Sequence, residues 1–239
     1  DIDPEVVVAA RDANRLTPLG RMPMPSADEI RGSSHIVGQC GTETFARALA
    51  LDADVIIAGR ACDTAVFAAI RTRVSGARWV QADAPSVKIE GAIRVGERAV
   101  LVAGTADPVF MSKVHEIFPE VERVVRSIVA GDWRVYPRAY GLGVLNGGAA
   151  PTVGASREAG LLIEFIAETT AQAKAVAAVY KQNLLHFGFP GRVSTAGNIA
   201  FPFTPPELVC GTAYRFSLYH VMRVDAVEPL FDVRAESVG

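Results

Sequence analysis

The chain has 239 residues, of which 50% are hydrophobic and 21% charged, and it carries a formal net charge of −2 with a pI near 6.1. This length permits one large domain or two smaller ones with a substantial buried core. The near-neutral charge and the absence of a Lys/Arg cluster argue against a nucleic-acid-binding surface, and no apolar run approaches the ~20 residues of a membrane-spanning helix.

The beginning of the chain and its cysteines bear on the compartment. The first residues have neither a basic n-region nor a long apolar h-region, so a cytoplasmic protein is the default expectation. Cys40, Cys62 and Cys210 show no Cys-x-x-Cys spacing. This argues against both a disulfide framework and a structural zinc site.

After a short helix expected near residues 4–12 and a Pro-punctuated connector, residues 33–70 predict two consecutive strand-loop-helix units. Strands joined through a helix run parallel, so we expect a parallel βαβ unit at the front of the chain. The two loops, 38–42 and 59–64, should then adjoin at the carboxyl edge of the sheet, where open α/β sheets bind ligands.

These two loops contain the first candidate site residues. Arg60 suits a bidentate contact with a carboxylate or phosphate, and Gln39 and Thr64 are further substrate-binding candidates. Asp63 fits a general base or a metal ligand, although capping a helix is an equally good reading. Cys62 fits a thiol of lowered pKa at a helix N-terminus, or a small buried filler.

The passage from the apolar helix pattern ending at Ile70 to the β-like stretch starting at Arg71 contains no turn residue. Chains seldom change element without a turn. We therefore expect that residues are missing between Ile70 and Arg71.

Residues 86–104 alternate with period two around Gly96, which predicts an antiparallel hairpin. Lys88 and Glu90 lie two residues apart on one face of the first strand, so they form either a catalytic pair or an exposed ion pair. A helix should follow, with Asp107 as its N-cap, Pro108 at its first position, and a restart at Pro119.

The last third predicts a strand, a Gly-rich connection, a second strand, a helix and a final strand. The Gly-x-Gly of the connection is followed by no helix, so it is not a nucleotide fingerprint. Residues 131–239 therefore indicate an α+β, sandwich-like second half behind an α/β domain at residues 1–130. Arg192 and Asn198 lie in a loop with several Gly and Pro residues, where their side chains can position a substrate.

Four motifs in order along the chain resemble the acyclic terpene utilisation protein (AtuA-like) family: IVGQCGTETF, ADVIIAGRACDTAVFAA, VKIEGA with AGTADP, and LLHFGFPGRVSTAGNIAFPF with FSLYH. The similarity runs from about residue 36 to residue 222. It implies that the sheet's first strand precedes Asp1, and that a long segment with its own His, Lys and Glu-Cys residues belongs between Ile70 and Arg71. It also implies a bacterial catabolic protein found beside acyl-CoA carboxylases, dehydrogenases and hydratases, but it supplies no mechanism.

We therefore expect an enzyme that acts on a branched carboxylic acid or its acyl-CoA by lyase- or hydratase-type acid-base chemistry. Arg60 would hold the anion, and Asp63 or Glu90, with Lys88 nearby, would move the proton. The alternative is a non-catalytic acyl-ligand-binding or assembly subunit. A divalent metal such as Mg²⁺ is left open, and a homo-oligomer is expected, with a small companion subunit as an option.

Overall fold

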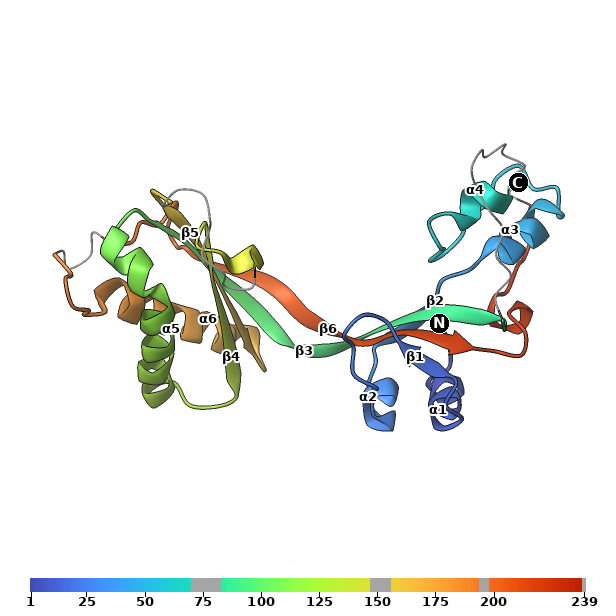
Figure 1. Ribbon diagram of the computed structural model, residues 1–239, viewed down its shortest axis with the longest axis horizontal. Coiled ribbons are helices and arrows are strands. Elements are labelled where there is room, and N and C mark those ends of the chain that lie inside the picture. The colour runs from blue at the N-terminus through green and yellow to red at the C-terminus, as the bar shows by residue number, and fades with distance from the viewer. Residues whose placement is uncertain (70–82, 147–155, 194–197, 238–239) are drawn as a thin grey trace. The chain divides into compact units, whose positions relative to one another are not determined.

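The computed structural model describes most of the chain, namely residues 1–69, 83–146, 156–193 and 198–237 (Figure 1). Its internal contacts group into two compact units. Unit 1 comprises Asp1–Arg94 with Tyr214–Gly239, and unit 2 comprises Val95–Ala213. The first boundary between these units lies at 94/95, earlier in the chain than the expected division at 130/131, and the end of the chain belongs to the first unit.

The described strands form a six-stranded sheet in the order β1-β6-β3-β5-β4, with β2 also paired to β3. Two long strands, β3 (Ser86–Thr105) and β6 (Glu207–Arg223), contribute residues to both units. Each pair of strands with a defined register is antiparallel. The shorter strands are β1 (Leu16–Pro18) and β2 (His35–Gly38) in unit 1, and β4 (Trp133–Tyr140) and β5 (Ala159–Ala167) in unit 2.

The hairpin expected around Gly96 is wrong, because β3 continues through this position as one strand of 20 residues. Gly96 has a φ of 140°, a conformation that L side chains rarely adopt, and a Cβ there would collide with the carbonyl oxygen of Ala167. The glycine therefore allows a close approach of β5 to a continuous strand. A glycine within an alternating stretch is typical both of a turn and of such a close approach, so the sequence did not distinguish the two.

Unit 2 has two layers, with helices α5 (Pro108–Ile128) and α6 (Thr170–His186) packed against its part of the sheet (Figure 1). Alternate residues of the strands face these helices, as the period of two predicts. Unit 2 thus combines helices with antiparallel strands, which is the α+β character expected for the second half of the chain. The largest buried side chains of this core are Phe110, Trp133, Phe165 and Tyr180.

The caps of the two long helices follow the sequence. Asp107 is the N-cap of α5, where its carboxylate accepts hydrogen bonds from the backbone N–H groups of Val109 and Phe110 at 2.8 and 3.1 Å. Thr169 caps α6 in the same way through the N–H of Gln172 at 3.2 Å. Pro119, by contrast, lies inside one continuous helix, so the expected restart is wrong.

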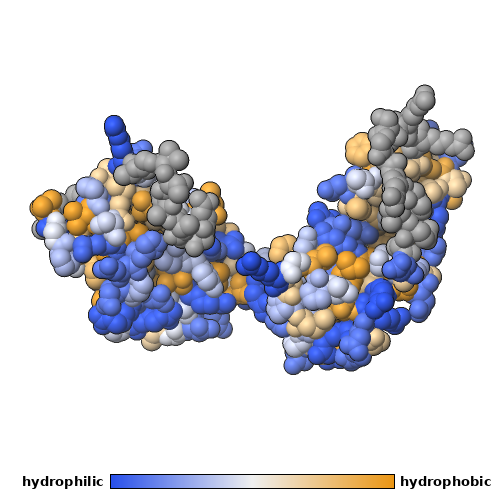
Figure 2. All heavy atoms as spheres, in the orientation of Figure 1, coloured by the Kyte–Doolittle hydropathy of each residue, from blue (hydrophilic) through white to orange (hydrophobic). Residues whose placement is uncertain are grey.

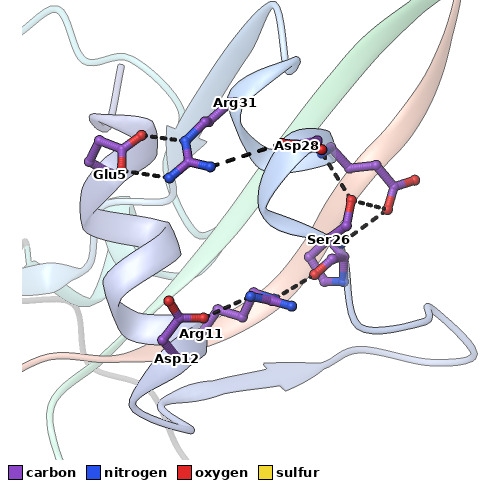
Figure 3. A network of polar contacts seen from close by, with 8 residues as sticks. Glu5, Arg11, Asp12, Ser26, Asp28 and Arg31 are labelled. Carbon is purple, nitrogen blue, oxygen red and sulfur yellow. Dashed lines mark hydrogen bonds and ion pairs between the residues drawn. The ribbon is translucent and has the colours of Figure 1, made fainter.

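Unit 1 packs α1 (Pro4–Asp12) and α2 (Ala27–Arg31) against its strands, with Val7, Ile30, Ile36 and Leu218 in the core. Figure 3 shows polar contacts on the outer side of these helices. Arg31 on α2 binds the Glu5 carboxylate on α1 through two hydrogen bonds of 2.7 and 3.1 Å. Because both side chains are largely exposed, this pair adds little stability; it holds the two helices in register.

The parallel unit expected at the front of the chain is wrong in its main feature. β2 pairs antiparallel with β3, and residues 54–58 form no strand. Val55 and Ile57 are 74% and 94% exposed, so the apolar run is not buried in a sheet. It lies instead between the short helices α3 (Thr42–Leu49) and α4 (Ala65–Ala69), where apolar side chains also reach the surface (Figure 2).

The expected break between Ile70 and Arg71 lies outside the described residues. Among the helices of the described segments, none combines the length and apolar character needed to cross a bilayer.

Candidate functional site

The two loops singled out from the sequence do adjoin, although the strands before them are not parallel neighbours. The Cys40 N–H donates to the Arg60 carbonyl at 3.0 Å, and the Cys62 N–H donates to the Cys40 carbonyl at 3.1 Å. Together these bonds make a single parallel bridge between Cys40 and Ala61. The bridge fixes the Arg60 backbone beside the end of β2.

This placement brings Arg60 to a carboxylate on β3. Arg60 Nη2 lies 3.2 Å from Glu90 Oε2, and Lys88 Nζ lies 3.2 Å from Glu90 Oε1. Gln39 Nε2 donates to Glu90 Oε1 at 3.0 Å. The structure thus brings Gln39 and Arg60, two candidates from the loops, to Lys88 and Glu90, which the sequence had nominated as a pair. We call Gln39, Arg60, Lys88 and Glu90 the Glu90 cluster.

Glu90 is the inner member of this cluster, since its side chain is only 13% exposed whereas that of Arg60 is 55% exposed. Burial raises the pKa of Glu90, but hydrogen bonds and charge attraction from Lys88 and Arg60 outweigh it, so the pKa is lowered overall. Glu90 therefore stays ionised at neutral pH. At pH 7 Arg60 and Lys88 each carry a positive charge and Glu90 carries a negative one, so the cluster has a net charge of about +1.

Tyr219 is a contact of this cluster that the sequence did not reveal. Lys88 Nζ lies 4.5 Å from the centre of the Tyr219 ring. A hydrogen bond to the Tyr219 side chain is the largest cause of the raised pKa of Lys88, with Glu90 adding to it. Tyr219 belongs to β6, so its approach depends on the pairing of strands far apart in the sequence, for which no local signal exists.

The other nominated residues of the second loop are not part of the cluster. Asp63 and Thr64 are exposed, and the Thr64 hydroxyl oxygen lies 3.9 Å from the Cys62 sulfur. α4 has only five residues, and the N-cap of α3 is Gly41, which offers no side-chain cap. A helix-terminus anion site is therefore not supported here. Cys40 is buried, and burial raises the pKa of its thiol.

A cavity of about 370 Å³ lies in unit 1 next to this loop. We call it the Arg60 cavity, because Arg60 is among its lining residues. Its walls come from the end of β2, from α3, from residues 51–60 and from residues 230–234. Most of the lining residues are apolar, including Phe45, Ile56 and Phe231. The charged residues of the lining besides Arg60 are Asp1, Asp232 and Arg234.

The wall formed by residues 230–234 is held in place by α3. Arg47 Nη1 donates to the carbonyl oxygens of Glu228 and Phe231 at 3.4 and 3.3 Å. Arg234 is ion-paired with Asp232 at 2.5 Å, so its charge is partly satisfied within the same wall. Arg60, in contrast, forms its ion pair with Glu90, which is not a lining residue of the cavity.

Arg192 and Asn198, the remaining candidates, lie in unit 2. Arg192 donates to the carbonyl oxygens of Phe187 and Leu185 at 2.6 and 3.0 Å, so it satisfies the C-terminal end of α6 and has a structural use. Asn198 is 3% exposed, and both polar atoms of its amide are buried without a hydrogen-bond partner. Such a group costs roughly 1–3 kcal/mol when unsatisfied.

Metal binding is not supported by a ligand cluster. The described segments contain no group of three or more His, Cys, Asp or Glu side chains that could hold an ion. Mg²⁺, left open by the sequence, stays a prediction.

Comparison with known proteins adds no family assignment. The chain matches no family model, no curated protein and no solved structure. The resemblance to the AtuA-like family therefore stays a prediction drawn from its motifs.

Proposed function

We propose that the protein is an AtuA-like catabolic protein that binds a branched carboxylic acid, or the acyl part of its CoA thioester, in the Arg60 cavity. One observation carries this proposal: Arg60, on an adjoining loop, is a lining residue of a cavity most of whose other lining residues are apolar. Such a lining suits a ligand with one anionic end and a branched hydrocarbon body.

The capacity of Arg60 to take a ligand anion follows from its geometry. The contact with Glu90 uses Nη2, and the guanidinium has five N–H donors, so donors remain for a carboxylate. Lys88 and Gln39 also hold Glu90, so Glu90 keeps partners when Arg60 turns toward a ligand. The half-exposed side chain of Arg60 has the freedom for this movement.

The size of the cavity agrees with the acyl part of such a ligand. About 370 Å³ is near the lower end of small-molecule sites, which range over roughly 300–1,000 Å³. A short branched acid is of suitable size, whereas the nucleotide part of CoA would have to remain outside.

Catalysis is the second part of the proposal, and the Glu90 cluster would perform it. In lyase- or hydratase-type chemistry, Lys88 would donate a proton and Glu90 would accept one. None of Lys88, Glu90 and Asp63, the other base candidate, lines the cavity; the contact of Glu90 with the lining residue Arg60 is what favours Glu90.

One observation favours the non-catalytic alternative, an acyl-ligand-binding or assembly subunit. The lowered pKa of Glu90 makes its carboxylate a weak base, better suited to holding Arg60 and Lys88 than to removing a proton. Exposed apolar side chains also suit association with a second copy or a small companion subunit. In unit 1 these include Val55, Ile57 and Phe67.

A thermal-shift screen tests the proposal. Free branched acids, their CoA thioesters and straight-chain acids of equal carbon number are compared, with and without Mg²⁺, on the wild type and on Arg60→Ala. Branched ligands should raise the melting temperature of the wild type alone. Failure of every acid and thioester to do so would overturn the proposal. For ligands that do bind, mass analysis after incubation with the protein distinguishes an enzyme, which changes the mass of its ligand or forms a product, from a binding subunit, which does not.

A further inference from the structure

The strands and α-helices of unit 2 follow one another as β3, α5, β4, β5, α6 and β6, and the strands lie in the order β6-β3-β5-β4. This is the βαββαβ arrangement of ferredoxin-like sheets. Both helices pack on the face where the core of the unit lies (Figure 1). We call the other face the open face. Its charged and aromatic members on β3, β4 and β5 are Arg98, Arg134, Tyr136, Arg138, Tyr140 and Glu164.

β4 repeats arginine and tyrosine along the open face. Trp133 of this strand belongs to the core under the helices. Alternation therefore places four residues on the opposite side, namely Arg134, Tyr136, Arg138 and Tyr140. Tyr136 and Tyr140 are 41% and 39% exposed. Neighbouring members of this row are two residues apart, which is about 7 Å along a strand, so each exposed tyrosine has an arginine at that spacing.

Glu164 on β5 joins two arginines of the open face. Its Oε1 accepts a hydrogen bond from Arg98 Nε at 2.6 Å, and its Oε2 accepts one from Arg138 Nη2 at 3.1 Å. The Glu164 side chain is 14% exposed, whereas those of Arg98 and Arg138 are 31% and 35% exposed. Both arginines keep further N–H donors, since a guanidinium has five. With the exposed Arg134, the charges of the open face sum to about +2 at pH 7.

This charge and the exposed rings decide the kind of partner. A second copy of the same face would bring like charges together, so an anionic partner is favoured. An anion with flat rings matches the tyrosines, because every nucleobase can stack on an aromatic side chain. Guanidiniums in turn bind phosphates through two N–H groups. We propose that the open face of unit 2 binds single-stranded nucleic acid, with bases stacked on Tyr136 and Tyr140 and with phosphates at the three arginines.

A single strand suits this face better than a duplex. In a duplex the bases stack on one another, so they are not available to the tyrosine rings. The four-stranded sheets of RNA-binding domains stack unpaired bases on exposed aromatic side chains in the same way. The open face needs no cavity for this contact, because the bases lie flat on the rings.

The sequence argued against a nucleic-acid surface from the net charge and from the lack of a basic cluster. Residues of the opposite face separate Arg134 from Arg138 along the chain, and Arg98 joins them only through the pairing of β3, β5 and β4. The net charge of −2 still weakens long-range attraction. We therefore expect weak binding, with a Kd of about 1–100 µM.

Fluorescence anisotropy of a labelled oligothymidylate of about 12 nucleotides measures this binding on the full chain. For phosphates at three arginines, log K should fall with log [salt] with a slope of about −2, and Arg134→Gln should make it shallower by about 0.7. Tyr136→Leu should weaken binding by about 10-fold, whereas Tyr136→Phe should retain it, because the ring stacks and not the hydroxyl. Arg123→Gln, on the exposed side of α5, is the matched control and should bind as the wild type does.

An abasic strand tests stacking on the wild type without any variant. It has the same phosphates, so it should bind at least about 10-fold more weakly than oligothymidylate of the same length. The proposal is overturned if the abasic strand or a duplex binds as tightly, or if Tyr136→Leu with an unchanged melting temperature binds as the wild type does. Displacement of the oligonucleotide by poly-glutamate at equal charge concentration would also overturn it and assign the face to an acidic protein. Arg60→Ala should keep this binding, so failure of the proposed function at the Arg60 cavity remains distinguishable.

Discussion

The guanidinium of Arg60 lies 3.2 Å from the carboxylate of Glu90, although the two residues come from a loop and from a strand 30 positions further along the chain. The contact joins an exposed cation to a nearly buried anion. Since Lys88 and Gln39 hold the same carboxylate, Arg60 is one of three partners. Its removal would not leave Glu90 uncompensated, which separates the effect of Arg60 on ligand binding from its effect on stability.

Arg60→Ala should weaken the binding of a branched acid by about 10- to 100-fold, because a charge-assisted contact is worth roughly 1.5–3 kcal/mol. The melting temperature should change no more than in Arg123→Ala, a control that removes an exposed i,i+3 ion pair with Glu120. Arg60→Lys should recover part of the affinity. Titration calorimetry and thermal melts of the same samples decide the matter: a large loss of stability with unchanged affinity contradicts the anion-binding role.

Glu90→Gln should change the acid stability of the protein. The pKa of Glu90 is lowered from its ordinary value of 4.5, so its contribution is present above that pH and is lost as the pH falls through the folded-state pKa. Urea unfolding between neutral and acidic pH should show a smaller decline for Glu90→Gln than for the wild type in this window. Glu43→Gln, on an exposed part of α3, serves as the control. Identical pH profiles for wild type and Glu90→Gln would refute the assigned pairing.

His220 should make the protein less stable as the pH falls below neutrality. Burial lowers its pKa from 6.5, and the backbone carbonyl of Pro23 offsets only part of this. Below about pH 6.5 the unfolded chain takes up a proton that the folded chain does not, so stability declines until the folded-state pKa is reached. The free energy of unfolding of His220→Met should lack this slope, whereas the exposed His115→Gln should retain it.

Arg47→Ala should loosen the wall of the Arg60 cavity. It removes two hydrogen bonds to the carbonyls of residues 228 and 231. Each such bond contributes roughly 0.5–1.5 kcal/mol to the free energy of unfolding. Amide hydrogen exchange should accelerate in residues 228–234, and ligand affinity should fall by about 2- to 10-fold. Unchanged exchange in this segment would show that Arg47 does not hold it.

Gly96→Ala should be strongly destabilising, because it adds both an unfavourable φ and a collision with the Ala167 carbonyl. We expect a loss of more than about 2 kcal/mol in the free energy of unfolding. Gly160→Ala is the matched control, since it lies in a neighbouring strand of the sheet with nothing within 4 Å of the added Cβ. Equal stability of the two variants would disprove the close approach.

Features whose causes lie within a few residues could be predicted from the sequence. Asp107 and Thr169 cap their helices because a short polar side chain reaches the first unpaired N–H groups of the same helix. Lys88 and Glu90 share a face because side chains alternate along a strand, whatever its partners are. The sequence also predicted that the loops containing Cys40 and Arg60 adjoin. This prediction is confirmed, although the parallel strands from which it was derived are not present.

Which strands pair and which polar groups meet depends on the folded arrangement of distant segments. An apolar run such as residues 54–58 predicts a strand only if a sheet edge is there to receive it, and here Val55 and Ile57 remain exposed. Gly96 gives the signal of a turn, but its role depends on a carbonyl 71 positions away. The partner of Lys88 on β6 and the unpartnered amide of Asn198 likewise depend on contacts between distant segments. Local propensity cannot specify these contacts, because their free energy arises only once the chain has folded.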